Sequence, residues 1–224
     1  MESLAVTSLT EFGINTNVIG TMWAELADQA VVKRTWAALE ERGFHVEFLN
    51  NKEEALERLK ILIPPNAEVM TGSSTTLKEI GFVDFLSSGK HEWNNLKEKI
   101  VSEKDPKKQA ELRKKSVTSE YFLGSVHAIT QSGEVVIASA TGSQLSSYVD
   151  ASNNVIWVVG TQKIVLNLEE GLRRIREYVL PLEDQRMKQA GFRGSTIAKI
   201  LIFEKETLPF RKITLIFVNE KLGF

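Results

Sequence analysis

The residues best suited to chemistry follow the short apolar run Val69-Met70. They form a turn rich in glycine and hydroxyl side chains: Gly72, Ser73, Ser74, Thr75 and Thr76. Thr76 and Glu79 have the spacing of a capping box, which predicts a helix start there. A strand that turns into a capped helix presents free backbone N–H groups, so the turn is a candidate site for phosphate or carboxylate. The turn lacks the lysine of a P-loop and the G-x-G-x-x-G motif of dinucleotide-binding proteins. The structural alternative is that these residues only cap the helix and bind no ligand.

Glu134 is the best single candidate for a catalytic carboxylate. It follows Gly133, whose turn separates two predicted strands. A glutamate in a partly apolar cleft can abstract a proton if burial raises its pKa toward neutrality. An exposed turn carboxylate is the structural alternative. Gln131 and Ser132, in the same turn, are weaker candidates for binding a ligand.

Thr141, Gly142 and Lys163 also follow predicted strand ends, and we expect them to line the same cleft. Lys163 supplies a mobile positive charge suited to an anionic ligand. Taken alone, it is more typical of a solvated loop lysine. His127 lies within a predicted strand, where a hydrogen-bonded core histidine is more common than a ligand, and the histidine spacing predicts no metal site.

Composition restricts the class of protein. The chain has 224 residues, with 28 basic and 29 acidic side chains and a net charge of −1, which argues against a nucleic-acid-binding protein. It has no cysteine, so disulfides, thiolate catalysis and Cys-ligated zinc or Fe–S sites are excluded within it. There is neither a basic N-terminal region nor an apolar run of membrane-spanning length. We therefore expect a cytoplasmic protein without a signal peptide or membrane span.

The elements that position these residues begin with a helix over 22–42. A strand over 44–49, a helix capped by Asn51 with Glu54, and a strand over 68–71 follow. Short links between them predict a βαβ unit in a parallel sheet. The Gly72 turn would then lie at the carboxyl edge of the sheet, where ligands bind in open α/β proteins.

The pattern in the rest of the chain predicts further strands of the same sheet and a helical insertion. Residues 76–124 have an almost wholly helical pattern, with the insertion at about 82–118. Strands are expected over 125–130 and 134–139, joined as a hairpin or by a sharp corner. Further strands are expected at 155–159, 197–203 and 213–218, and helices after Asn167 and from Pro181. We predict a loosely ordered lead-in over 1–20 and a single α/β domain over 21–224. Backbone amides behind Gly72 should lie beside the corner at Gly133, so that both face one anionic ligand.

Five segments in this order resemble the LUD domain, a family named for lactate utilisation. They are Thr71–Gly81, Ser125–Glu134, Val158–Val165, Leu180–Arg186 and Ile216–Phe224, and the resemblance covers about residues 20–224. It implies a Rossmann-like, mostly parallel sheet flanked by helices, as in ribose-phosphate isomerase, glucosamine-phosphate deaminase and the CoA transferases. His127 departs from the family pattern, which more usually has Asn, and the turn at 141–144 is less rich in Asn and Arg.

The resemblance implies a protein of L-lactate oxidation to pyruvate that works beside Fe–S subunits and binds a small anionic ligand, with the Fe–S clusters only in those partners. A homo-oligomer is compatible with it. A second hypothesis is a stand-alone enzyme of the sugar-phosphate isomerase or CoA-transferase kind, in which Glu134 acts as base or attacks a thioester carbonyl. A third is a sensor or scaffold without chemistry. Fold transfers more safely than chemistry in such comparisons.

Overall fold

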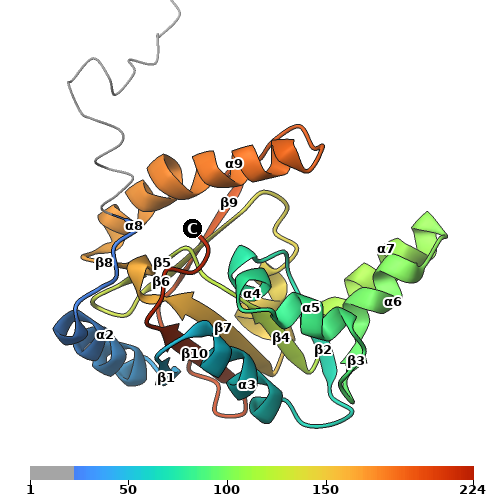
Figure 1. Cartoon of the computed structure of the whole chain (residues 1–224), viewed down its shortest axis with the longest axis horizontal. Helices are drawn as coiled ribbons and strands as arrows, with labels where there is room; N and C mark the ends of the chain where they lie inside the picture. The colour runs from blue at the N-terminus through green and yellow to red at the C-terminus, as the bar shows by residue number, and fades with distance from the viewer. Residues whose placement is uncertain (1–22) are drawn as a thin grey trace, which may run out of the picture.

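The computed structural model describes residues 23–224, so the predicted lead-in over 1–20 lies outside the described part (Figure 1). A six-stranded sheet lies at the centre in the order β1-β10-β7-β4-β2-β3. All five strand pairs are parallel. The strands are β1 (His45–Leu49), β2 (Glu68–Thr71), β3 (Asn94–Asn95), β4 (Tyr121–Gly124), β7 (Asn154–Gly160) and β10 (Lys212–Val218). The fold class is therefore α/β with a mostly parallel, Rossmann-like sheet.

Both faces of this sheet are covered, as the continuous apolar runs of its central strands require. On β7, Trp157 faces one side, and its neighbours Ile156 and Val158 face the other. The second of these faces packs on three helices, α3 (Lys52–Leu62), α4 (Thr75–Glu79) and α5 (Phe82–Ser87). The first face packs on α2 (Gln29–Glu41) and on a second sheet.

The second sheet has four strands in the order β8-β5-β6-β9. They are β5 (Ala128–Thr130), β6 (Val135–Ser139), β8 (Ile164–Val165) and β9 (Lys199–Phe203). The predicted hairpin is present as the antiparallel pair β5–β6. The prediction that residues 197–203 belong to the parallel sheet is wrong, because β9 pairs antiparallel with β6.

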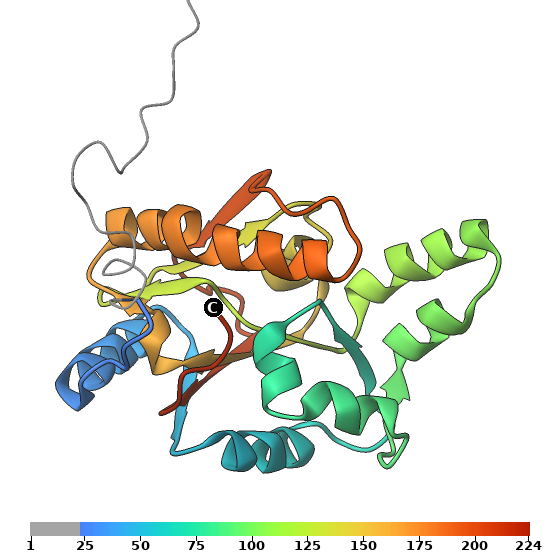
Figure 2. The same ribbon diagram turned by 45° about the horizontal axis from the view of Figure 1, so that its top comes forward.

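A long helix covers the outer face of the second sheet (Figure 2). It runs through α8 (Leu168–Arg174), a π-helical turn (Ile175–Val179) and α9 (Leu180–Gln189). Asn167 caps it as predicted, accepting a hydrogen bond from the N–H of Glu170 at 3.0 Å. Pro181 does not begin a separate helix. It lies near the start of α9, directly after the π-helical turn and inside this continuous helix.

The segment over 76–124 is only partly helical. Helices α6 (Leu96–Ser102) and α7 (Pro106–Lys115) project from the body of the molecule (Figures 1 and 2). The prediction of helix up to residue 124 is wrong, because Tyr121–Gly124 is β4, which lies between β2 and β7. The short β3 is a further strand within this segment.

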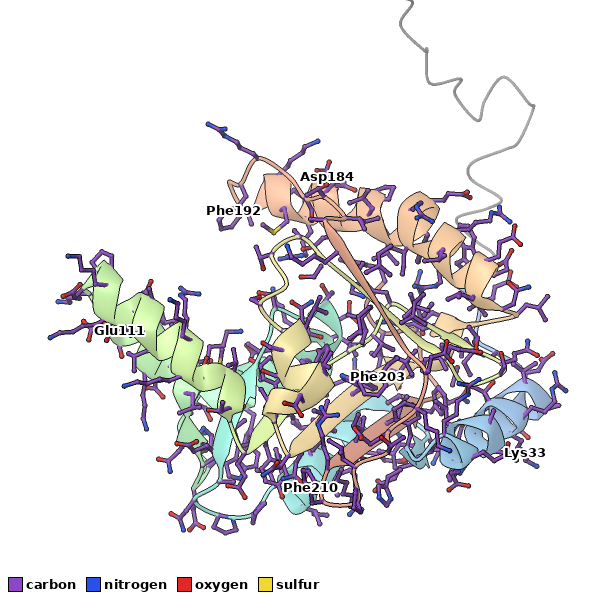
Figure 3. The ribbon with its side chains drawn as sticks, turned by 180° about the vertical axis from the view of Figure 1, so that it is seen from behind. Lys33, Glu111, Asp184, Phe192, Phe203 and Phe210 are labelled. Atoms are coloured by element: carbon purple, nitrogen blue, oxygen red, sulfur yellow. The ribbon has the colours of Figure 1, made fainter. Side chains whose placement is uncertain are left out.

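Aromatic side chains join the two sheets at the centre of the molecule. Phe203 of β9 packs edge-on against Trp157 of β7, with ring centroids 5.9 Å apart, and also against Phe44. Viewed from behind, Phe203 lies inside, whereas Phe192 and Phe210 lie on outer loops and are exposed (Figure 3). The second sheet is therefore packed on the first as one body.

Candidate functional site

The candidate site lies at the carboxyl edge of the parallel sheet. Four neighbouring strands, β10, β7, β4 and β2, end there. The segments that follow them bring together Gly223, Lys163, Ser125 and Thr76. This is the edge at which ligands bind in open α/β sheets.

Lys163 is the centre of the cluster. Its side chain is 2% exposed, and its Nζ donates to Thr76 Oγ1 and to Ser125 Oγ, both at 3.1 Å. Burial, together with the positive charge of Arg174, lowers the pKa of Lys163 to about 7, and Glu79 acts in the opposite sense. Within residues 23–224 no carboxylate lies within ion-pairing distance of Nζ. The cluster thus holds a buried amine that changes its charge near neutral pH and has only hydroxyl partners.

The segment after β10 lies over Lys163. The N–H of Gly223 donates to Glu79 Oε2 at 2.6 Å, and the carbonyl of Leu222 accepts from Gln162 Nε2 at 2.9 Å. Gly223 has a φ of +61°, and a Cβ there would overlap Thr76 Oγ1 and lie 3.3 Å from Lys163 Nζ. Only glycine fits this close approach without strain.

The Gly72 turn differs in detail from its prediction. The helix cap is Ser74, whose Oγ accepts from the N–H of Leu77 at 3.2 Å, so the predicted box at Thr76 and Glu79 is wrong. Thr76 instead lies inside α4 with its hydroxyl between Lys163 and the carbonyl of Leu222. Its side chain therefore belongs to the site, although not as a cap.

The predicted ligand residues divide into two groups. A Cβ on Gly72 would lie 3.7 Å from Cβ of Gln144, so the turn at Thr141 and Gly142 lies beside the Gly72 turn. Lys163 reaches the same region through Thr76. Ser73 lies in the turn itself and is exposed, whereas Thr75 is the first residue of α4 and is partly buried. These residues form one neighbourhood, as predicted from their positions at strand ends.

The corner at Gly133 lies elsewhere, which corrects the prediction that it meets the Gly72 turn. A Cβ on Gly133 would come within 3.0 Å of the backbone of Ala38 in α2. Gln131 accepts from Arg34 at 3.3 Å, and the carbonyl of Ser132 accepts from Arg42 at 2.7 Å. The antiparallel turn of the hairpin therefore directs these residues to α2 rather than to the carboxyl edge.

Glu134 is held by the same helix. Its carboxylate pairs with Arg42 at 2.9 Å and accepts hydrogen bonds from Thr130 and from Ser132. Partial burial acts to raise the pKa of Glu134, but these hydrogen bonds and Arg42 outweigh it and hold the pKa below its ordinary value. A carboxylate kept ionised by three partners fastens the hairpin to α2 and does not face the Gly72 turn.

Two further groups near Lys163 are structural. Arg174 is fully buried, donates to the carbonyls of His127 and Trp23, and has its pKa lowered to about 10 by burial. His127 Nδ1 accepts from the N–H of Ala138 at 3.1 Å. Burial and the charges of Lys163 and Arg174 lower the pKa of His127 to about 3, so it is neutral and fixed at physiological pH.

Metal binding and membrane insertion find no support in the described residues. Between residues 23 and 224 no group of three His, Asp or Glu side chains is placed to bind a metal ion. Over the same range, each helix is too short or too polar to cross a membrane.

Comparison with known proteins agrees with this architecture. The LUD domain model matches residues 32–193. The chain belongs to the LUD domain family. This LUD domain protein is also similar to the crystal structure of a DUF162 family protein from Deinococcus radiodurans, with a TM-score of 0.51 and 9% sequence identity. The match covers 87% of this chain and 100% of that chain. At this identity the similarity shows the fold alone. None of the curated proteins matches.

Sequence reasoning missed Ser125, Gln162 and Gly223. Ser125 directly follows an unrecognised strand, and the only signal near it was that it begins the segment Ser125–Glu134, which resembles the LUD domain. Gly223 lies close to the end of the printed sequence, in a segment that gave no helix or strand signal. Its contact with Lys163 depends on the parallel pairing of β10 with β7, which brings residues far apart in the sequence to one edge.

Proposed function

We propose that this LUD domain protein takes part in lactate utilisation, the oxidation of L-lactate to pyruvate, beside Fe–S oxidoreductase subunits. In this role it binds a small anionic ligand, a carboxylate or a phosphorylated compound, at Lys163. Family membership supports the metabolic setting. Because the chain has no cysteine, the Fe–S clusters would be bound by partner proteins.

The observation that carries the ligand proposal is the surroundings of Lys163. A buried ammonium group is costly unless an opposite charge or good hydrogen bonds compensate it. Lys163 has two hydroxyl partners, Thr76 and Ser125, and no carboxylate partner among the described residues. An anion bound there would accept a hydrogen bond from the third N–H of the Lys163 ammonium group. It would also favour the charged form of the amine.

Calorimetric titration with L-lactate, pyruvate and inorganic phosphate tests this proposal. Lys163→Met should abolish binding, whereas Lys78→Met, an exposed lysine of α4, should leave it unchanged. Affinity should fall as the pH rises above about 7, because the amine loses its charge. Equal affinity of the wild-type protein and Lys163→Met for every anion would refute the site.

The metabolic part of the proposal needs a separate test. Protein isolated from its own host under gentle, anaerobic conditions should co-purify with Fe–S proteins, recognised by their electron paramagnetic resonance signals. Lactate-dependent dye reduction by that complex should disappear when this chain is removed. A complex that oxidises lactate equally well without it would refute the accessory role while leaving anion binding intact.

A catalytic alternative of the isomerase or CoA-transferase kind is favoured by one observation. The pKa of Lys163, lowered to about 7, suits a general acid or base at neutral pH. The acid–base group would then be Lys163 rather than Glu134, which is engaged by Arg42. Turnover of sugar phosphates or acyl-CoA that is lost in Lys163→Met and retained in Glu134→Gln would establish this alternative.

A further inference from the structure

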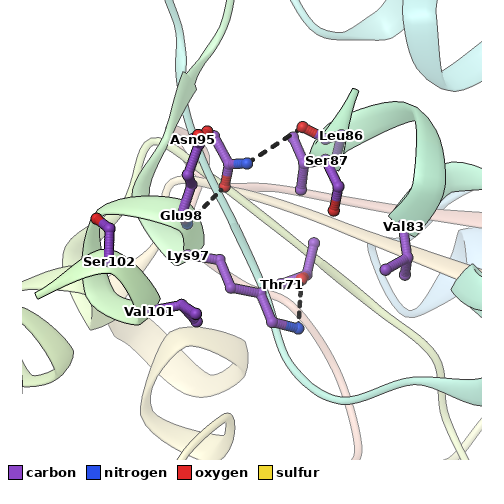
Figure 4. A pocket seen from close by; sticks show the side chains of 9 residues that line it. All are labelled: Thr71, Val83, Leu86, Ser87, Asn95, Lys97, Glu98, Val101 and Ser102. Atoms are coloured by element: carbon purple, nitrogen blue, oxygen red, sulfur yellow. Dashed lines mark hydrogen bonds between the residues drawn. The ribbon is translucent and has the colours of Figure 1, made fainter. Parts of the chain in front are cut away.

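A second lysine contacts the Gly72 turn. Lys97 of α6 donates through Nζ to Thr71 Oγ1 at 3.2 Å (Figure 4). It also donates to the carbonyl of Gly72 at 3.3 Å. Both partners are neutral oxygens. In the described part of the chain, no carboxylate lies within 4.0 Å of this ammonium group. One of its three N–H donors therefore remains available.

Lys97 lines an open pocket of about 310 Å³ between α5, α6 and the end of β2. The walls are mainly apolar, formed by Val83, Leu86 and Val101, with hydroxyls from Ser87 and Ser102 (Figure 4). The Asn95 side chain also lines the pocket and is engaged, donating to the carbonyl of Leu86 and accepting from the N–H of Glu98. The pocket thus combines one free cationic donor with an apolar interior.

The charge of Lys97 is poorly compensated in this setting. Burial lowers its pKa below the ordinary value for lysine, and no opposing effect from a carboxylate accompanies it. A monoanion placed beside Nζ would offset that desolvation. Since Lys97 is the only cation in the pocket lining and Glu98 stands exposed at the rim, a dianionic phosphate is disfavoured.

The size of the pocket limits the ligand. Its volume is at the lower end of the range typical of small-molecule sites, roughly 300–1,000 Å³. That suits a carboxylate with a short hydrocarbon chain.

We propose that this pocket binds a short aliphatic monocarboxylate. The carboxylate accepts a hydrogen bond from Lys97, and the chain lies against Val83, Leu86 and Val101. This site is separate from the one at Lys163, because it opens between α5 and α6 and shares none of the Lys163 contacts.

Ligand-observed NMR and calorimetry with hexanoate test the proposal. Acetate removes the chain, hexan-1-ol removes the charge, and hexylamine reverses it. Hexanoate should bind at least about tenfold more tightly than each of these, since both the ion pair and the apolar burial are needed. Lys97→Met should weaken hexanoate binding by about tenfold or more, whereas Lys99→Met, an exposed lysine of the same helix, should leave it unchanged.

Two further variants keep the test decisive. Val83→Phe fills the pocket but retains Lys97, and it should also abolish hexanoate binding. Lys163→Met should retain hexanoate binding, which separates this result from the fate of the proposed function. The proposal would be overturned if the wild-type protein failed to bind hexanoate at millimolar concentration, or if Lys97→Met or Val83→Phe bound it as tightly as the wild-type protein.

Discussion

The buried position of Lys163 makes the stability of the protein depend on pH. The pKa of this amine is about 7 in the folded protein, against an ordinary value of 10.5 for an exposed lysine. Between these two values the unfolded chain binds a proton that the folded protein does not. The free energy of unfolding therefore rises with pH across this window, and the cost of burying the charge is complete below about pH 7.

Replacing Lys163 with Met removes this dependence and keeps the side chain up to its Cε position. From the two pKa values, the contribution of Lys163 to the free energy of unfolding should rise by about 2 kcal/mol between pH 7 and pH 9. Met also leaves the hydroxyls of Thr76 and Ser125 without their donor, at a cost of about 1–3 kcal/mol, but that cost does not vary with pH.

Urea unfolding followed by tryptophan fluorescence at pH 7, 8 and 9 measures the effect. The difference in free energy of unfolding, wild type minus Lys163→Met, should increase by about 2 kcal/mol over this range. The exposed-lysine variant Lys78→Met should give a constant difference. Parallel pH profiles for the wild-type protein and Lys163→Met would show that Lys163 stays charged in the folded state, and the reasoning would fail.

Three other substitutions test separate parts of the structure. Gly223→Ala should overlap the hydroxyl of the site, release the segment after β10 and lower the free energy of unfolding by about 1–3 kcal/mol, detected as faster hydrogen exchange at residues 220–224. Arg211→Met should cost about 3–5 kcal/mol in thermal or urea unfolding, because it leaves the buried carboxylate of Glu206 unpaired. Glu134→Gln should lower the free energy of unfolding by roughly 1–2 kcal/mol through its lost ion pair and hydrogen bonds, with ligand affinity at Lys163 unchanged in calorimetry.

Each of these has its own control. Gly89 has a similar φ of +66° with nothing within 4 Å of an added Cβ, so Gly89→Ala carries the backbone strain without the overlap. If both glycine variants behave alike, the close packing over Lys163 is not what selects glycine. The double variant Arg211→Met/Glu206→Leu should recover part of the stability lost in Arg211→Met. A loss of ligand binding in a folded Glu134→Gln protein would contradict the structural role of Glu134.

Helix-capping patterns predicted the structure correctly where both partners of the hydrogen bond lie close together in the sequence. Asn51 caps α3 as predicted, because its side chain accepts from the N–H of Glu54 three residues away, at 2.8 Å. The same spacing failed at Thr76, since distant residues, Lys163 and Leu222, take its hydroxyl. A capping pattern cannot register a partner that arrives from another strand.

Strand pairing was less predictable than strand position. β9 begins two residues after the predicted strand over 197–203 does and ends where it does, but its partner is β6 rather than a parallel strand. β4 is four residues long and follows charged helices. Its short apolar run could therefore not be distinguished from the buried face of a helix. The position of the Gly133 turn was mispredicted for a similar reason. The turn between the two strands was predicted, but its packing against α2 is a tertiary contact that the local sequence does not indicate.

The position of β10 also has a consequence for biosynthesis. This strand lies between β1 and β7, and within residues 23–224 β1 pairs with β10 alone. A nascent chain therefore carries β1 without its β10 neighbour until the ribosome has made residues 212–218. During that interval its edge is open to wrong pairing. Chaperones that shield emerging strands should matter most for this protein just before translation reaches β10.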